Sequence, residues 1–142
     1  MKVKIKLVDK SLPLPQYQTT GAVAFDLYAR VETVINPGEV IRIPTNLIIE
    51  VPEGYMLFIK DRSSTAGKKG LLCTPGFIDQ DYHGPDDEIL FQAYNFTAKP
   101  VIVERGERVG QASFIKIEKP EWEQIAGDIK EDSRGGFGTT GK

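Results

Sequence analysis

Short apolar runs with a spacing of two, separated by turns rich in proline and glycine, constrain the fold of this chain most strongly. Such runs begin with Val3, Ile5 and Leu7 and continue at 40–51, 55–59, 89–96, 101–103 and 109–117. Turn signals such as Asn36-Pro37-Gly38 and Pro52-Glu53-Gly54 separate them. Turns repeated at intervals of roughly 8–12 residues are typical of β-sandwiches and barrels. We therefore expect an all-β fold.

Composition limits the classes of protein that the chain can belong to. Its 142 residues, 40% of them hydrophobic, suffice for one domain. The 18 basic and 20 acidic residues leave a net charge of −2, which argues against nucleic acid as a partner. No apolar run is long enough for a membrane span, and the N-terminus lacks the apolar core of a signal peptide. The single cysteine, Cys73, fits a reducing compartment. We expect a soluble cytoplasmic protein.

The C-terminal segment differs in composition from the rest of the chain. Residues 1–120 carry the pattern of strands and turns, whereas 127–142 consist largely of Gly, Thr, Ser and charged residues. We therefore divide the chain into a β domain, 1–120, and a C-terminal arm, 121–142, with Trp122 expected to pack at the base of the arm. The best helix signal is a single turn within 62–69, although a polar loop explains those residues equally well.

Two acidic residues near the middle of the chain are candidates for catalysis. Asp79 and Asp81 would point to the same face if they lay on a strand, where one could act as a general base or lie near a metal. A solvated hairpin tip is the alternative. Gly76 and Gly84 on either side indicate a hairpin whose backbone approaches another group closely.

Three further segments could take part in binding. Arg62-Ser63-Ser64 offers a guanidinium and two hydroxyls to a phosphate, or else forms a capped surface turn. The glycine-rich tail 134–141 could fold over a planar anion such as a nucleotide, with Phe137 as its aromatic contact, or be a disordered tail. Asp26 lies inside an apolar strand, so it needs a partner or serves a site.

Taken in order, these segments resemble the five motifs of the trimeric dUTP pyrophosphatase (dUTPase) family over nearly the whole chain. The matching segments are Ala24-Phe25-Asp26-Leu27-Tyr28-Ala29, Asp61-Arg62-Ser63-Ser64-Thr65-Ala66, Gly76-Phe77-Ile78-Asp79-Gln80-Asp81-Tyr82-His83-Gly84, Gly106-Glu107-Arg108-Val109-Gly110-Gln111 and Gly135-Gly136-Phe137-Gly138-Thr139-Thr140-Gly141. The resemblance implies a distorted jelly-roll-like β-barrel or sandwich with at most one short helix and an extended C-terminal arm. It also implies a homotrimer in which each active site is shared between chains and the arm of one subunit closes over a neighbour's site.

The resemblance further implies hydrolysis of dUTP to dUMP and pyrophosphate with Mg²⁺, which keeps uracil out of DNA and supplies dUMP for dTMP synthesis. Asp79 would activate the water that attacks the α-phosphorus. Tyr82 would pack under the deoxyribose and exclude a 2′-hydroxyl. Gln111 would lie near the α-phosphate, and Asp26 would act through the water shell of the metal, which the triphosphate mainly holds.

The remaining family positions would bind substrate. The hairpin backbone would read the uracil edge at Cys73, Gly76, Phe77 and Ile78. The phosphates would be held by Arg62, Ser63 and Ser64. From the arm, Phe137 would stack on uracil, and the γ-phosphate would be cradled by Arg134, Gly138, Thr139 and Thr140.

This sequence departs from the family pattern in several places. Arg134 stands closer to the glycines of the arm than is usual, Asp61 replaces a Pro or Gly, and Cys73 stands where many relatives have Asn. Two other functions remain open. A dCTP deaminase of the same fold would need an activating Glu after the hairpin, for which Glu88 is the nearby candidate. A β-sandwich module could bind the nucleotide without hydrolysing it.

Overall fold

The fold is taken from a computed structural model that describes residues 1–129 and 135–136. Eleven strands and one turn of π-helix make up its regular structure. The strands are β1 Ile5–Leu7, β2 Phe25–Tyr28, β3 Thr33–Ile35, β4 Val40–Pro44, β5 Leu47–Ile49, β6 Tyr55–Asp61, β7 Leu71–Cys73, β8 Gly76–Ile78, β9 Leu90–Asn95, β10 Val101–Val103 and β11 Arg108–Lys116, and the helical turn, η1, is Thr65–Lys69. The expectation of an all-β fold with at most one short helix is confirmed.

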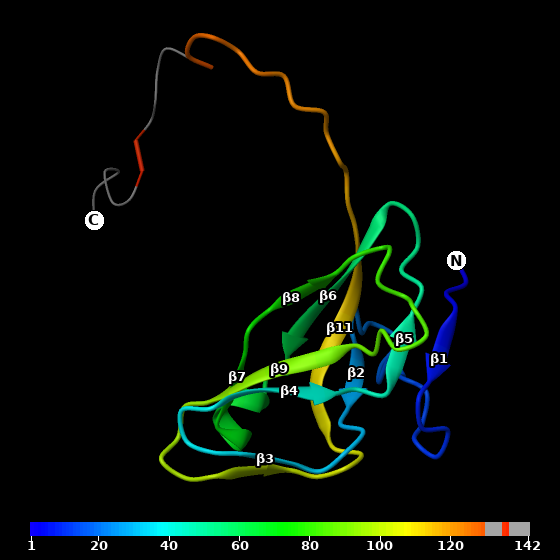
Figure 1. Cartoon of the computed structure of the whole chain (residues 1–142), viewed down its shortest axis with the longest axis vertical. Helices are drawn as coiled ribbons and strands as arrows, with labels where there is room; N and C mark the ends of the chain where they lie inside the picture. The colour runs from blue at the N-terminus through cyan, green and yellow to red at the C-terminus, as the bar shows by residue number, and fades with distance from the viewer. Residues whose placement is uncertain (130–134, 137–142) are drawn as a thin grey trace.

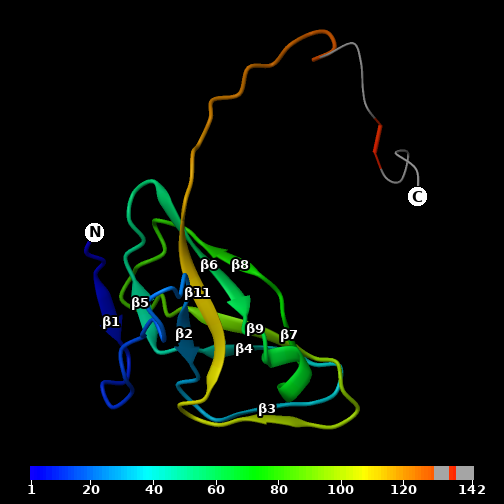
Figure 2. The ribbon, with the colours of Figure 1, turned by 180° about the vertical axis from the view of Figure 1, so that it is seen from behind.

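The strands form two larger antiparallel sheets and two strand pairs. One sheet has the order β2-β11-β6-β8 and the other β4-β9-β7, while β1 pairs with β5 and β3 with β10. Figures 1 and 2 show the strands of the three-stranded sheet running across those of the four-stranded sheet. The side chains buried between them form one core, which includes Leu27, Ile35, Ile43, Leu57, Leu71, Phe91 and Val103. This arrangement is the expected jelly-roll-like barrel.

Strand β9 shows how the spacing of two specifies the fold. Phe91 and Ala93 are completely buried, whereas Leu90, Gln92 and Tyr94 lie on the outer face. Successive side chains of a strand point to opposite faces, so a shift of one residue would expose the buried set. The pattern therefore fixes which residues of β9 face outward, and Gln92 is one of them.

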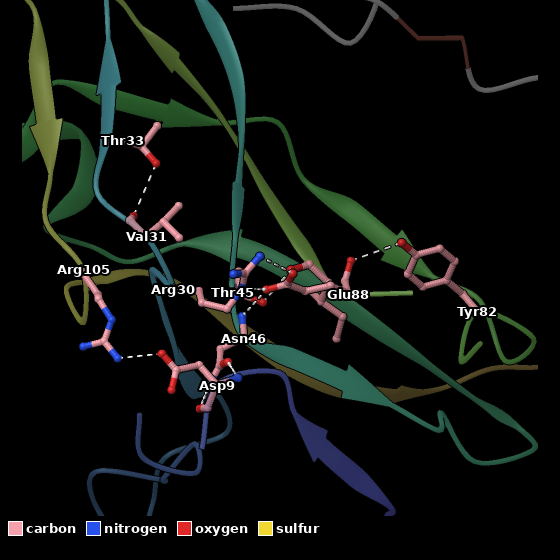
Figure 3. Close-up of polar contacts among 10 residues, drawn as sticks. Asp9, Arg30, Val31, Thr33, Thr45, Asn46, Tyr82, Glu88 and Arg105 are labelled. Carbon is pink, nitrogen blue, oxygen red and sulfur yellow. Dashed lines mark hydrogen bonds and ion pairs between the residues drawn. The ribbon is translucent and has the colours of Figure 1, made fainter. Parts of the chain in front are cut away.

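A polar cluster ties the N-terminal segment to the segment that precedes β9 (Figure 3). Asn46 has a φ of 72°, and its side chain is buried. Its Oδ1 accepts a hydrogen bond from Asp9 N at 2.6 Å, and its own backbone N donates to Glu88 Oε1 at 2.7 Å. Asn tolerates the left-handed region better than most residues. Asn46 therefore turns the chain between β4 and β5 while it anchors both neighbouring segments.

The chain leaves the β body after β11. Ile117 N still donates to Gly54 O at 2.8 Å, and the following residues, drawn in yellow-orange and orange, run away from the body (Figure 1). Trp122 is 93% exposed. The expectation that Trp122 packs at the base of the arm is therefore wrong, because the arm diverges from the body before that residue. Among the described residues, no helix is long and apolar enough to cross a membrane.

Candidate active site

Residues 74–78, within the segment 73–78 that we call the hairpin, form one wall of an open cavity of about 350 Å³, the hairpin cavity. The two strands of this segment do not pair with each other as in the expected hairpin, because β7 pairs with β9 and β8 with β6, in different sheets. Gly76, Phe77 and Ile78 line the hairpin cavity together with Tyr82, as the family resemblance predicts for a nucleoside pocket. β8 is held in place by antiparallel pairing with β6, in which Gly76 lies opposite Ile59. Nothing lies within 4 Å of a Cβ built on Gly76, so the glycine leaves this wall open. The other lining residues are Arg42, Ile59, Thr74, Pro75, Leu90 and Gln92.

Asp79 follows directly on β8 and lies in a turn. Tyr82 N donates to Asp79 O at 3.3 Å, which closes the turn, so Asp79 and Asp81 do not lie on a strand as the sequence pattern allowed. Asp79 is exposed, and within 1–129 and 135–136 its carboxylate has no hydrogen-bond or ion-pair partner. The Tyr82 hydroxyl donates to Glu88 O at 3.1 Å, which fixes the ring against the cavity (Figure 3). A carboxylate that no neighbour occupies can accept a proton from water.

Cys73 is the last residue of β7 and the first residue of the segment 73–78. Burial, with a smaller contribution from the negative charge of Asp61, raises the pKa of the Cys73 thiol to about 11. The thiol Sγ lies 3.3 Å from Thr74 O, to which it can donate a weak hydrogen bond. Cys73 is therefore a neutral group at physiological pH and does not resemble an activated thiolate nucleophile.

A second cluster gathers residues of the first, second and fourth motifs. Asp26 is buried, with Arg62 Nε at 2.9 Å from its Oδ1 and Arg108 Nη1 at 3.3 Å from its Oδ2. Gln111 lies opposite Asp26 in the β2–β11 pairing, and its Nε2 donates to Asp61 O at 2.9 Å. Two guanidinium groups on one buried carboxylate leave the remaining Arg62 and Arg108 N–H groups available to an anion.

The segment between β6 and β7 is held by Thr65 rather than by the two serines. Arg62 N donates to Thr65 Oγ1 at 3.0 Å, and Thr65 Oγ1 donates to Val109 O at 3.3 Å. The expected helical turn is present but begins at Thr65, and the Ser64 side chain does not cap it. In the described part of the chain the Ser63 and Ser64 hydroxyls have no partner. They remain available as donors for a phosphate.

Arg62 and Ser64 line a second cavity of about 280 Å³. Lys68, Lys69 and Arg108 add positive charge to its wall, and Glu107, which pairs with Lys69 at 2.5 Å, adds one negative charge. Among the residues that the structure describes, none lines both this cavity and the hairpin cavity. The structure thus divides the predicted site residues into a hairpin half with Tyr82 and a basic half with Arg62 and Ser64. Asp79, directly after β8, is assigned to the hairpin half, and Gln111, which donates to Asp61 O, to the basic half, although neither lines either of these two cavities.

The predicted site residues of the arm lie outside the described part of the chain, and several residues around the two cavities were not predicted. Arg134, Phe137, Gly138, Thr139 and Thr140 lie outside the described residues. Sequence reasoning did not single out Arg108, although the lone Asp26 in an apolar strand was a signal that a cationic partner was needed. It also missed Arg42, Gln92 and the side chain of Thr74 in the hairpin cavity, because strand pairing brings them together from three separate segments.

Glu88 does not face the hairpin cavity as a free carboxylate. Arg30 donates to both of its oxygens, at 2.8 and 2.9 Å, and Asn46 N donates to Oε1 at 2.7 Å (Figure 3). The Glu88 side chain is 13% exposed. A carboxylate held by three donors is a structural anchor, so this geometry does not favour the water-activating role that a dCTP deaminase would require of Glu88.

Comparison with known proteins decides the family. The model of the dUTPase family matches residues 10–141. The chain belongs to the dUTPase family. Its members are hydrolases, and a deoxyuridine 5′-triphosphate nucleotidohydrolase from Dictyoglomus turgidum is 39% identical over 99% of both chains.

Solved structures of dUTPases share the fold. The dUTPase of Staphylococcus bacteriophage 80alpha, solved with dUPNHPP, superposes with a TM-score of 0.88 over 99% of both chains at 23% identity. A mutant dUTPase from phage phi11 of S. aureus, whose structure describes the coordination of a structural Mg(II) ion, superposes with a TM-score of 0.80 at 19% identity, over 89% of this chain and 98% of its own. At these identities the likeness establishes the fold of this dUTPase family member.

Proposed function

We propose that this protein hydrolyses dUTP to dUMP and pyrophosphate. The observation that carries the proposal is the hairpin cavity, which Gly76, Ile78 and Tyr82 line, in a chain of the dUTPase family. Asp79 follows Ile78 directly, and its carboxylate has no partner among the described residues. The relatives' names give the same substrate. Removal of dUTP keeps uracil out of DNA, and the dUMP formed can supply dTMP synthesis. The single cysteine supports action in a reducing cytoplasm.

Asp79 is the general base in this proposal. Its carboxylate would accept a proton from the water that attacks the α-phosphorus, and its position directly after β8 ties it to the base-reading hairpin. A well-placed general base contributes about 10²–10⁴ in rate. Tyr82, fixed by its hydroxyl on Glu88 O, would pack under the deoxyribose and leave no room for a 2′-hydroxyl. Backbone groups between Cys73 and Ile78 would read the uracil edge.

The basic half would hold the phosphates. Arg62, Ser63 and Ser64 present a guanidinium and two hydroxyls that have no partner in the described part of the chain, and Gln111 would lie near the α-phosphate. Phosphoryl transfer depends mainly on such positioning and on charge neutralisation. Magnesium bound to the triphosphate would supply part of that neutralisation. Both oxygens of Asp26 already bind arginine, so its donor chemistry fits a contact through metal-bound water better than direct ligation.

The separation of the two halves supports a site shared between subunits. We propose a homotrimer in which the hairpin half of one chain faces the basic half of a neighbour. The arm from residue 121 onward would close over a site on a neighbouring subunit, which fits its departure from the β body and the exposure of Trp122. In the closed arm Phe137 would stack on uracil, and the γ-phosphate would be held by Arg134, Gly138, Thr139 and Thr140.

Pyrophosphate release tests this function. The protein is incubated with Mg²⁺ and separately with dUTP, dTTP, dCTP and UTP, and release from dUTP alone is expected. Asp79→Asn should bind dUTP and lose about 10²–10⁴ in turnover. Asp81→Asn, which removes an equally exposed carboxylate two residues away, is the matched control and should retain activity. Release from none of the nucleotides would favour a binding module, and near wild-type turnover by Asp79→Asn would contradict the role of Asp79.

A further inference from the structure

Three polar side chains lie side by side across the outer face of the β4-β9-β7 sheet, on the wall of the hairpin cavity. Arg42 and Gln92 are direct partners in the β4–β9 pairing, and Thr74 follows β7, whose Cys73 pairs with Ala93. Thr74 N donates to Gln92 O at 3.3 Å, which continues that pairing by one residue. All three residues line the cavity that contains Gly76, Ile78 and Tyr82. We call them the Arg42–Gln92–Thr74 network.

The hydrogen bonds of the Arg42–Gln92–Thr74 network have a fixed direction. Arg42 Nε donates to Gln92 Oε1 at 3.2 Å, and Gln92 Nε2 donates to Thr74 Oγ1 at 2.8 Å. A guanidinium has only donors, so it holds the carbonyl oxygen of Gln92 toward itself and turns the amide NH₂ toward Thr74. The Thr74 hydroxyl already accepts that hydrogen bond, and within residues 1–129 and 135–136 its own O–H has no acceptor, so it can donate to a ligand.

This direction makes the wall of the cavity a donor surface. The Arg42 guanidinium, the Gln92 NH₂ group and the Thr74 O–H all present hydrogens, and Arg42 also excludes a positively charged ligand group. Uracil carries a carbonyl oxygen at C4, which accepts a hydrogen bond, where cytosine carries an amine, which donates. Once the base covers this wall, a donor that faces an amine has no partner, and this mismatch is costly.

We propose that Thr74 reads the 4-carbonyl oxygen of the pyrimidine through its hydroxyl, and that Gln92 and Arg42 are positioning residues that set the direction of that hydroxyl. The inference rests on the proposed hydrolysis of dUTP and names the side chains that separate dUTP from dCTP. It adds side-chain recognition to the backbone of the hairpin. Arg42 and Gln92 act through Thr74 and need not touch the nucleotide.

The substitution Gln92→Glu reverses the direction of the hydrogen bond between position 92 and Thr74, while the shape of the side chain stays nearly the same. The new carboxylate at position 92 still accepts from Arg42, but it can only accept from Thr74, so the threonine O–H turns toward it and away from the ligand. The ligand then meets an oxygen lone pair, which suits an amine. The added negative charge acts equally on the two triphosphates, but it also repels a 4-carbonyl oxygen and attracts a 4-amine, so Thr74→Val, which adds no charge, isolates the loss of the hydroxyl donor.

The test compares wild type, Thr74→Val, Thr74→Ser and Gln92→Glu. For each protein, kcat and KM are measured for dUTP and dCTP, and binding of dUMP and dCMP is measured by calorimetry. We expect Thr74→Val to reduce the dUTP:dCTP ratio of kcat/KM about tenfold, mainly through a higher KM for dUTP, as loss of one neutral hydrogen bond implies. Thr74→Ser should retain the wild-type ratio, and Gln92→Glu should lower it at least as far as Thr74→Val.

The outcomes separate this proposal from the proposed function. An unchanged dUTP:dCTP ratio of kcat/KM in Thr74→Val and Gln92→Glu would overturn the role of the Arg42–Gln92–Thr74 network. An equal loss of kcat/KM for both nucleotides would also overturn it, because it would indicate a structural role only. Absence of dUTP hydrolysis by wild type would overturn the proposed function, and the preference for dUMP over dCMP in calorimetry would still decide the inference. Thermal unfolding of each variant verifies that it folds.

Discussion

Arg30 holds Glu88 through two parallel hydrogen bonds, from Nε to Oε1 at 2.8 Å and from Nη2 to Oε2 at 2.9 Å. The contact with Glu88 raises the pKa of Arg30, so the guanidinium keeps its positive charge. Glu88 also supplies the backbone oxygen that receives the Tyr82 hydroxyl. One ion pair thus links the β4–β5 turn, the segment before β9 and the aromatic ring of the hairpin cavity.

Replacement of Glu88 should therefore affect stability. In Glu88→Gln the amide keeps the shape but loses the charge-assisted hydrogen bonds, and we expect the free energy of unfolding to fall by about 2 kcal/mol. Urea denaturation measures this change. Glu53→Gln removes an exposed carboxylate and should shift the value by less than about 0.5 kcal/mol. Release of ammonia from dCTP by wild type would contradict the structural role that we give to Glu88.

Gly110 is a site where a single methyl group should destabilise the core. A Cβ built on Gly110 would lie 2.3 Å from Cε2 of Phe91, a ring that is completely buried. Because the Phe91 ring is packed on all sides, it cannot move aside freely, and Gly110→Ala should lower the free energy of unfolding by about 1–3 kcal/mol. Thermal and urea unfolding measure the effect.

Gly76→Ala provides the contrasting variant in the same four-stranded sheet. A Cβ at Gly76 meets no atom within 4 Å, so this variant should fold with wild-type stability. The methyl group would instead enter the hairpin cavity, and we expect a higher KM for dUTP. Equal stability of Gly110→Ala and Gly76→Ala would show that the Phe91 contact does not limit the core.

Cys73 should react slowly with alkylating reagents below its raised pKa. Burial disfavours the thiolate, and only the thiolate reacts with iodoacetamide. With a pKa of about 11, the thiolate fraction of Cys73 at pH 8 is far below that of an unfolded chain, and the rate should rise steeply as the pH approaches 11. Mass spectrometry of alkylated protein gives the rate at each pH, and urea-unfolded protein is the control. Fast alkylation of the folded protein at pH 8 would contradict the burial of this thiol.

Much of the fold could be predicted from the sequence, because apolar and polar residues alternate along a strand that has one buried face. Val3–Leu7 and the runs around β4, β5, β6, β9, β10 and β11 all alternate or contain β-branched residues, and the turns between them contain proline or glycine. β3 was not predicted, although it is no shorter than β10; its sequence Thr33-Val34-Ile35 has only two apolar residues, whereas all three residues of β10 are apolar. Trp122 was misjudged because the direction of the arm depends on contacts that local sequence does not encode.

Only part of the candidate site could be predicted from the sequence. Asp79 and Tyr82 could be found because their motif is continuous in sequence, although the sequence could not tell a strand from the turn that Tyr82 N closes on Asp79 O. Arg42 and Gln92 are 50 residues apart, and only the β4–β9 register makes them neighbours. The division of the motifs between two cavities is likewise a property of the folded chain, since motifs adjacent in sequence need not face the same surface.

The division into two cavities gives the sharpest test of shared sites. Asp79→Asn damages the hairpin half, and Arg62→Gln damages the basic half while Arg108 still binds Asp26. Each variant alone should be nearly inactive. If a site combines the hairpin half of one chain with the basic half of another, random mixing of equal amounts of the two variants restores about a quarter of the sites, because each intact half comes from one variant at even odds. The two chains are mixed by joint unfolding and refolding, pyrophosphate release from dUTP is measured, and light scattering gives the mass of the assembly. Activity that stays at the level of the separate variants, or a monomeric mass, would show that each chain builds its own site.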